Sequence, residues 1–205
     1  IGRINWLRGK YETALEYYND ALKMADSLRN ESMQGMINLL AGIAYQDMGY
    51  YDLATGRILL ATELFEKMNY LSKLPYAYNY LGSVYFELQD NEKALSSFRK
   101  ALDGFLQNGD QWGKAVTYRY MGRSFRRLQL SDSALYYFRA SLALANNLND
   151  KSGELYSRRF LAEVLFEQGE QDSARILFNE NIDKSVLTGN IREKVNNLYD
   201  LGLLY

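Results

Sequence analysis

A 40-residue repeat is the feature that most constrains the fold of this chain. Small residues recur at that spacing throughout, at Gly2, Gly42, Gly82, Gly122, Ala162 and Gly202. Two further rows of mostly small residues keep the same period, at Ala14, Ala54, Ala94, Ala134 and Ala174 and at Ala21, Ala61, Ala101, Ser141 and Asn181. Three rows in phase predict one supersecondary unit that is repeated and stacked on its neighbours along the chain.

Each period is predicted to hold two antiparallel helices. A single proline in 205 residues leaves almost nothing to interrupt helices. The pattern places the end of one helix near Leu88 and the next helix from residue 92 to about residue 105. Small residues at Gly82 and Ala94 would let the two axes approach closely, and the bulky Phe98 would fill the space between layers.

Turn and cap residues keep the same phase. Glycines between the paired helices suit the left-handed conformation that often ends a helix, and they are Gly9, Gly49 and Gly169. Residues that favour the N-cap recur where repeats join, at Asn30, Asp110, Asp150 and Asn190. The joint at 68–76 differs, because it carries Tyr70 where a cap is expected and Pro75 just inside the next helix.

Composition narrows the classes of function. The chain has no histidine and no cysteine, so the commonest acid-base, nucleophilic and metal-binding chemistry is missing. We therefore expect no enzyme, no metal site and no cofactor. Twenty-four basic residues against 25 acidic ones give no global case for nucleic acid, and no apolar run has the ~20 residues of a membrane span. The cellular compartment stays open.

Two segments, residues 1–22 and 81–102, carry the residues of a known family. In the second they are the Leu-Gly pair at 81–82, an aromatic at Tyr85, the Ala-Leu pair at 94–95, Phe98 and Ala101. This pattern resembles the tetratricopeptide repeat. The period is 40 instead of the usual 34, and the family's proline near the end of the second helix is absent. The resemblance implies an all-α, right-handed superhelical solenoid of antiparallel helix pairs.

The repeats divide the chain at regular positions. We expect one repeat domain over 1–205, composed of 1–34 (partial), 35–74, 75–114, 115–154, 155–194 and 195–205 (partial). Because the first and last repeats are incomplete, the chain is expected to be a fragment of a longer protein, in which an output domain would lie outside these residues.

The resemblance also implies a role. Members of this family are interaction scaffolds, so the expected function is binding of a peptide or protein, an acidic one, in a concave groove lined by the first helix of each repeat. The alternative is a sensor module of a bacterial signalling or transcriptional regulator. The expected groove residues are Asn79, Tyr80, Arg119, Tyr120, Arg123, Arg126, Tyr156, Arg159 and Phe160.

Four arginines in residues 117–128 raise two interpretations. If equivalent positions of successive repeats lie side by side, Arg123 would pair with Glu163, and Arg127 would lie between Glu87 and Glu167. Arg119 and Arg159 share a row without an acid, which suits a bidentate carboxylate or phosphate ligand. The alternative is that both are solvated or stack on tyrosines; for Arg126, stacking on a ring and ligand contact stay equally open.

Overall fold

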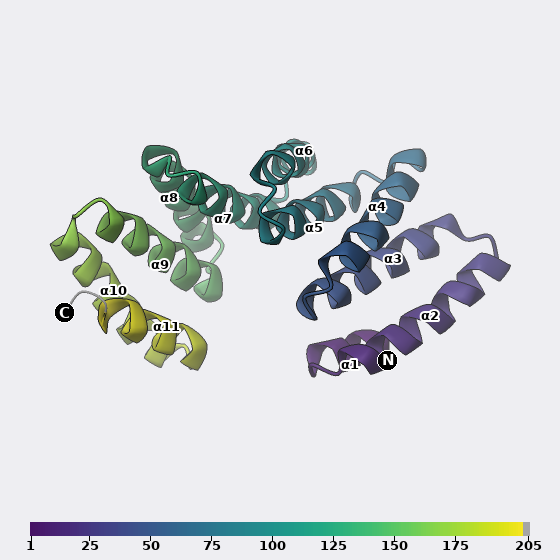
Figure 1. Cartoon of the computed structure of the whole chain (residues 1–205), viewed down its shortest axis with the longest axis horizontal. Helices are drawn as coiled ribbons and strands as arrows, with labels where there is room; N and C mark the ends of the chain where they lie inside the picture. The colour runs from purple at the N-terminus through teal and green to yellow at the C-terminus, as the bar shows by residue number, and fades with distance from the viewer. Residues whose placement is uncertain (203–205) are drawn as a thin grey trace. The chain divides into compact units, whose positions relative to one another are not determined.

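A computed structural model of the chain describes residues 1–202, which form eleven α-helices and no strand (Figure 1). The last three residues of the expected partial repeat 195–205 lie outside the described residues. The helices fall into two compact units, residues 1–108 and residues 109 onward. The all-α fold of tandem helix pairs is confirmed. The division of 1–205 into one domain with the repeat boundaries given above stays a prediction.

Unit 1 contains six helices in chain order. They are α1 (Gly2–Leu7), α2 (Tyr11–Ser27), α3 (Glu31–Asp47), α4 (Tyr51–Lys67), α5 (Leu74–Glu87) and α6 (Asn91–Asn108). Each helix packs on the next one, and α3 also packs on α5. The odd-numbered helices are the first helices of their repeats, and the even-numbered ones are the second.

Unit 2 repeats this arrangement. Its helices are α7 (Gln111–Arg127), α8 (Ser131–Asn147), α9 (Lys151–Glu167), α10 (Gln171–Leu187) and α11 (Ile191–Gly202). Consecutive helices pack together, and α9 also packs on both α7 and α11. The first helices α7, α9 and α11 therefore lie side by side in one layer, and the side chains of this layer form the candidate site.

The predicted helix starts are confirmed. In the N-cap contacts the cap side chain accepts a backbone N–H three residues on: Asn30 at 3.0 Å, Asp110 at 2.8 Å, Asp150 at 2.9 Å and Asn190 at 3.2 Å. Pro75 stands in the first turn of α5, where a missing N–H costs nothing. Lys73, not Tyr70, is the N-cap residue of that helix.

The predicted turns are confirmed as well. The three in-phase glycines have left-handed backbones, with φ of 73° at Gly9, 79° at Gly49 and 83° at Gly169. In the repeats without a glycine, Gln89 and Gln129 adopt the same conformation, with φ of 62° and 59°. These glutamines accept a backbone strain of about 1–2 kcal/mol because the helix ends require that geometry.

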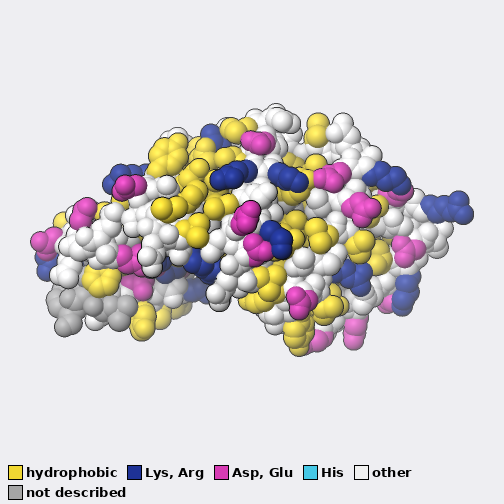
Figure 2. Space-filling view, turned by 45° about the horizontal axis from the view of Figure 1, so that its top comes forward, with side chains coloured by type: hydrophobic (Ala, Val, Ile, Leu, Met, Phe, Trp, Pro, Cys, Tyr) yellow, Lys and Arg dark blue, Asp and Glu magenta, His cyan; other side chains and the backbone are white. Residues whose placement is uncertain are grey.

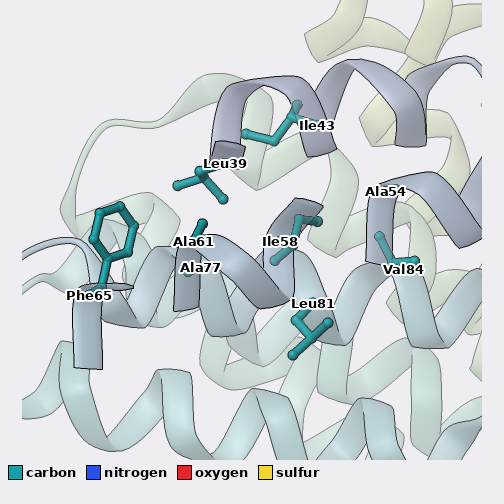
Figure 3. Packing of buried hydrophobic residues seen from close by; sticks show 9 residues of the cluster. All are labelled: Leu39, Ile43, Ala54, Ile58, Ala61, Phe65, Ala77, Leu81 and Val84. Atoms are coloured by element: carbon teal, nitrogen blue, oxygen red, sulfur yellow. The ribbon is translucent and has the colours of Figure 1, made fainter. Parts of the chain in front are cut away.

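Close packing between paired helices explains the regular spacing at which small and bulky residues recur along the chain. A Cβ atom placed on Gly82 would lie 2.6 Å from the ring of Phe98, and one placed on Gly122 would lie 2.6 Å from the ring of Phe138. Both rings are fully buried. Figure 3 shows the same layering in unit 1, where side chains of α3, α4 and α5 meet around Ile58. The predicted close approach of the paired helices is therefore confirmed.

The third row of the repeat changes character in unit 2, where it becomes polar and remains buried. The Ser141 hydroxyl of α8 donates to the carbonyl of Ala115 at 2.8 Å and lies 2.9 Å from the Ser157 hydroxyl. The Asn181 amide of α10 donates to the carbonyl of Leu155 and to Oδ1 of Asn197, both at 3.0 Å. Each second helix is thus bonded to the first helices on both sides of it.

Candidate functional site

The candidate site is the arginine cluster, defined as Arg119, Arg123 and Arg126 of α7 with Arg159 of α9. The three arginines of α7 are four and three residues apart, so they share one face of the helix. The opposite side of α7 carries Met121, which is buried in the unit. Packing of that apolar side directs the guanidinium groups toward α9.

Arg126 is held by two carboxylates of α9. Its Nε donates to Oε1 of Glu167 at 3.0 Å, its Nη2 donates to the same oxygen at 2.7 Å, and its Nη1 donates to Glu163. Burial alone lowers the pKa of Arg126, but the bonds and charges of Glu167 and Glu163 outweigh it and raise that pKa. Arg126 is therefore a structural cation that joins α7 to α9.

Glu163 lies between two guanidinium groups. Burial raises the pKa of this carboxyl above its ordinary value, and the charges of Arg159 and Arg126 offset that effect only in part. The nearby Asp200 carboxylate raises it further. The group thus has a high desolvation cost that its two ion pairs must repay.

Arg159 is also neutralised. It donates to Glu163 on its own helix, its Nε donates to Oε2 of Glu193 at 3.1 Å, and its Nη1 lies 3.5 Å from Asp200. Glu193 is fully buried, so removal of Arg159 would leave a buried carboxylate with one partner fewer. Its guanidinium also lies 4.5 Å from the ring centroid of Phe160. The row of Arg159 contains no acid, as expected, but Glu193 and Asp200 reach it from α11, so the expected interpretations of a ligand, solvation or stacking on a tyrosine left out its acidic partners.

Arg119 differs from both. Its guanidinium lies over the ring of Tyr156, 5.3 Å from the centroid, and within residues 1–202 it forms no ion pair with an acidic side chain. Burial lowers the pKa of Arg119, and attraction from Tyr120, Asp150 and Tyr156 offsets only part of that effect. A partly buried guanidinium stacked on an aromatic ring, without a bound carboxylate, can accept an anionic ligand.

Arg123 completes the cluster among aromatic rings. Its guanidinium lies 5.5 Å from the ring centroid of Tyr120 and 5.4 Å from that of Phe160. The structure thus brings together seven of the nine expected groove residues in unit 2. Their shared feature is alternation of guanidinium groups and ring faces, a surface suited to a planar carboxylate or to apolar groups on the rings.

The other two expected residues lie in unit 1, on α5. Asn79 is only 7% exposed, so most of its side chain is turned away from solvent. Tyr80 lines a pocket of about 240 Å³ together with Trp6 of α1 and Leu39 of α3. Nothing in the sequence showed that Trp6 and Leu39 border a pocket.

Several side-chain contacts between neighbouring first helices share two sequence separations, 37 and 41 residues, although Arg159 and Glu193 are 34 residues apart. The two shared values differ by one helical turn, so a side chain on one helix lies between two side chains on successive turns of the next helix. The bonds that follow this rule join Arg126 to Glu163 and Gln46 to Ser83 at 37 residues, and Arg126 to Glu167 and Trp6 to Asp47 at 41 residues.

This stagger corrects the predicted arginine pairing. Equivalent positions were expected to lie side by side, 40 residues apart, which would pair Glu163 with Arg123 and Glu167 with Arg127. In the structure Arg126 binds both carboxylates. The offset arises because ridges of one helix fit between the turns of its neighbour and not on top of them.

The remaining surface is mixed in character. Figure 2 shows basic, acidic and hydrophobic side chains interspersed on the face it presents. Within residues 1–202, no group of three or more acidic side chains is arranged to hold a metal ion. None of the described helices combines the length and the apolar character that crossing a bilayer requires.

Comparison with protein families gives a direct match. One family model described as "Tetratricopeptide repeat" matches twice, at residues 74–147 and 114–183, and a second model of the same description matches residues 1–27. Together these matches cover more than half of the chain. A comparison with curated protein sequences gives no significant match.

Solved structures of similar fold include BtubC (BKLC) from P. vanneervenii, at 20% identity and TM-score 0.81 over 92% of this chain and 78% of that one. The apo form of RapI matches at 15% identity and TM-score 0.89 over 100% and 74%. The Rap conjugation gene regulator of plasmid pLS20, in complex with the Phr* peptide, matches at 19% identity and TM-score 0.82 over 98% and 56%. At these identities the likeness extends to the fold alone.

Proposed function

Because the chain belongs to the tetratricopeptide repeat family, we propose that it is a non-catalytic interaction module that binds a peptide or protein segment on its layer of first helices. The proposed contact in unit 2 is an acidic group of the partner on Arg119, with apolar parts of the partner on the rings of Tyr156 and Phe160. Recognition by such a scaffold needs no catalytic group.

The observation that carries this proposal is the contrast between Arg119 and its neighbours. Arg126 and Arg159 are bound by carboxylates of their own unit, whereas Arg119 forms no ion pair with the residues that the structure describes. Burial of this cation without a direct ion pair, only partly offset by the attraction of Asp150, raises the free energy of the unbound protein. A partner carboxylate would lower that free energy, and its planar oxygens match the guanidinium fork.

A solved relative supports the peptide as the class of partner. The pLS20 regulator of similar fold is bound to the Phr* peptide, and this chain spans just over half of that protein. A layer of neighbouring helices presents side chains at regular intervals, which suits an extended segment better than a compact small molecule.

The test uses a displayed library of random short peptides, selected on the wild-type protein. The affinities of enriched peptides are then measured by fluorescence anisotropy for Arg119→Ala, for Arg119→Lys and for the matched control Arg139→Ala, whose arginine is exposed on the second helix α8. We expect enriched peptides to be acidic, with about tenfold weaker binding to Arg119→Ala and no change in Arg139→Ala. Equal binding by all four proteins would remove Arg119 from the site.

A second candidate function is a regulatory one, in which peptide binding is passed to an output domain of the same parent protein. The likeness to a conjugation gene regulator in complex with a peptide favours it. Sequencing of the coding region on both sides of these residues tests it. A kinase or DNA-binding region there would support the regulatory role, and its absence would leave the scaffold role alone.

A further inference from the structure

A second binding feature lies in unit 1, on the same kind of helix layer as the arginine cluster. An open pocket of about 240 Å³ is lined by the first helices α1, α3 and α5 and by Lys73, the residue before α5. Its walls are mainly apolar and aromatic, and the residues that line it are Arg3, Trp6, Met36, Leu39, Leu40, Ile43, Lys73, Tyr76 and Tyr80. We call this the Trp6 pocket.

The aromatic walls are held from outside the pocket. The Trp6 indole Nε1 donates to Oδ2 of Asp47 at 2.6 Å, which fixes the ring of α1 against α3. Tyr76 packs edge-on against Phe105 of α6, with ring centroids 4.9 Å apart. A pocket whose walls are already ordered loses little conformational entropy when it is occupied.

The charges at the pocket have one sign. Two cationic side chains line it, Arg3 and Lys73, and none of the described residues that line it is acidic. The Lys73 ammonium lies 5.9 Å from the ring centroid of Tyr76, at the edge of the aromatic wall. The carboxylate of Asp47, which lies against Trp6, accepts the hydrogen bond of its indole. An occupant with an apolar group and a neighbouring negative charge is therefore complementary to this site.

The size of the pocket selects between kinds of occupant. Sites for small-molecule ligands and cofactors typically enclose roughly 300–1,000 Å³, and the Trp6 pocket is smaller, at about 240 Å³. Its volume suits a single large side chain. Anchor residues of this kind, inserted in a preformed apolar pocket, commonly carry most of the affinity of a peptide or protein interface.

We propose that the Trp6 pocket is the anchor site for a peptide segment of a partner protein, and that it takes one bulky apolar side chain with an acidic residue beside it. The apolar side chain contacts Trp6, Leu39 and Tyr80, and the acidic one pairs with Arg3 or Lys73. This inference rests on the proposed function and adds a specificity that the arginine cluster does not supply.

The probe is an array of short peptides, acetylated at the N-terminus and amidated at the C-terminus. They place one variable residue between two Glu, two Gln or two Lys residues in a Gly-Ser background. Affinity is measured by fluorescence anisotropy. We expect Leu, Phe and Met at the variable position to bind about tenfold tighter than Ala there, and the Glu series to bind about tenfold tighter than the Lys series.

Charge exchange is the decisive variant. In Arg3→Glu/Lys73→Glu the preference should reverse, so that the Lys series binds tighter than the Glu series. The matched control Lys10→Glu/Lys23→Glu has the same change in net charge at two exposed positions of unit 1 and should keep the wild-type preference. A partly unfolded variant would lose binding of every series, so a reversed preference cannot come from misfolding.

Trp6 gives an independent optical signal. The chain has two tryptophans, so in a Trp112→Phe background the indole fluorescence comes from Trp6 alone. A shift in its emission on titration with the Phe-containing Glu peptide places the probe at the pocket. Sedimentation velocity of the unliganded protein tests whether a second copy of the chain occupies the pocket instead. Self-association that Trp6→Ala abolishes would assign the pocket to a second copy and overturn the proposal.

Failure of this inference can be told from failure of the proposed function. Peptides that depend on Arg119 but are insensitive to Arg3→Glu/Lys73→Glu leave the interaction module in place and overturn the anchor site. Affinity that is independent of the variable residue, or no binding at all in the array, overturns the anchor site as well.

Discussion

The guanidinium of Arg126 on α7 donates two hydrogen bonds to the carboxylate of Glu167 on α9, from Nε at 3.0 Å and from Nη2 at 2.7 Å. The two residues are 41 positions apart, one more than the repeat period. The same separation joins Trp6 to Asp47 in unit 1. Arg126 and Trp6 therefore contact the next repeat one position beyond their own equivalents, and Arg126 also binds Glu163, three positions before its equivalent.

The first prediction concerns this cation. Arg126→Ala should lower the free energy of unfolding by about 1–3 kcal/mol, because it removes one of the two arginine partners of Glu163, a carboxylate that is largely buried, together with the bonds to Glu167. Urea denaturation followed by circular dichroism measures the change. The control is Arg139→Ala, which removes an exposed arginine of α8 and should change the free energy of unfolding by less than about 0.5 kcal/mol. An Arg126 variant as stable as wild type would contradict the structural role.

Substitution of Arg119 should have a different effect. Arg119→Met keeps a long unbranched side chain beside Tyr156 and removes a partly buried charge that forms no ion pair within residues 1–202 and whose burial Asp150 offsets only in part. We expect stability within about 0.5 kcal/mol of wild type, or above it. The same denaturation experiment on Arg126→Met serves as the matched comparison, since that variant should be clearly destabilised. Equal losses in both variants would mean that Arg119 is as structural as Arg126.

The close approach of α5 and α6 gives the third prediction. Gly82→Ala should destabilise the protein by about 1–3 kcal/mol, because its Cβ would lie 2.6 Å from the buried Phe98 ring. Gly56→Ala is the control, since a Cβ there meets no atom within 4 Å in the middle of α4. It should stabilise by about 0.5–1 kcal/mol. Thermal unfolding that ranks the two variants the other way would contradict the packing.

The fourth prediction is a pH dependence. Burial alone would raise the pKa of Glu154, but hydrogen bonds from Lys184 and from Arg158, the latter at 3.0 Å, hold it below its ordinary value of 4.5. A depressed pKa in the folded state stabilises the fold above the unfolded pKa, and this contribution is lost as the pH falls through the folded pKa.

Glu154→Gln should therefore be less stable than wild type at pH 7, and the difference should shrink as the pH drops below 4.5. Urea midpoints measured from pH 7 to pH 3 give the curve. The exposed Glu180, which accepts a bond from Arg158 at 2.8 Å, is the control, and Glu180→Gln should give a smaller difference. A difference for Glu154→Gln that stays constant down to pH 3 would exclude the depressed pKa.

The fifth prediction concerns the buried amide of α10. Asn181→Ala should cost about 1–3 kcal/mol, because the carbonyl of Leu155 and Oδ1 of Asn197 each lose a donor in a dry environment. Asn146→Ala, at an exposed position of α8, should be nearly neutral. Amide hydrogen exchange in α11 should be faster in Asn181→Ala than in the wild type, because the variant lacks the hydrogen bond from Asn181 to Asn197. Equal exchange rates would contradict a role of this bond in holding α11 in place.

Much of the fold could be predicted from the sequence, because the repeat is a local property. Gly82 and Phe98 are 16 residues apart, and within one helix pair their spacing alone implied the contact that the structure contains. The cap residues Asn30 and Asp110 were equally predictable, since a cap bonds to a backbone N–H three residues away.

The candidate site was predicted less well. The arginines and the rings of Tyr156 and Phe160 do lie together in unit 2, and stacking of Arg119 on a tyrosine was one of the two interpretations. The acidic partners of Arg126 and Arg159 were not predicted, and Glu193, which binds Arg159, was not among the candidate residues. The Trp6 pocket had no sequence signal at all, since a cavity depends on how three helices are spaced.

The sequence by itself therefore determined the helices, their order, their ends and the pairs of small and bulky residues at which they touch. Only the tertiary structure decided that Arg126, and not Arg123, binds Glu163, and that Arg119 forms no ion pair with the described part of the chain. The physical reason is the stagger between neighbouring helices. Side chains of one helix lie between the turns of the next, and a shift of three residues along that interface moves the partner of Glu163 from Arg123 to Arg126.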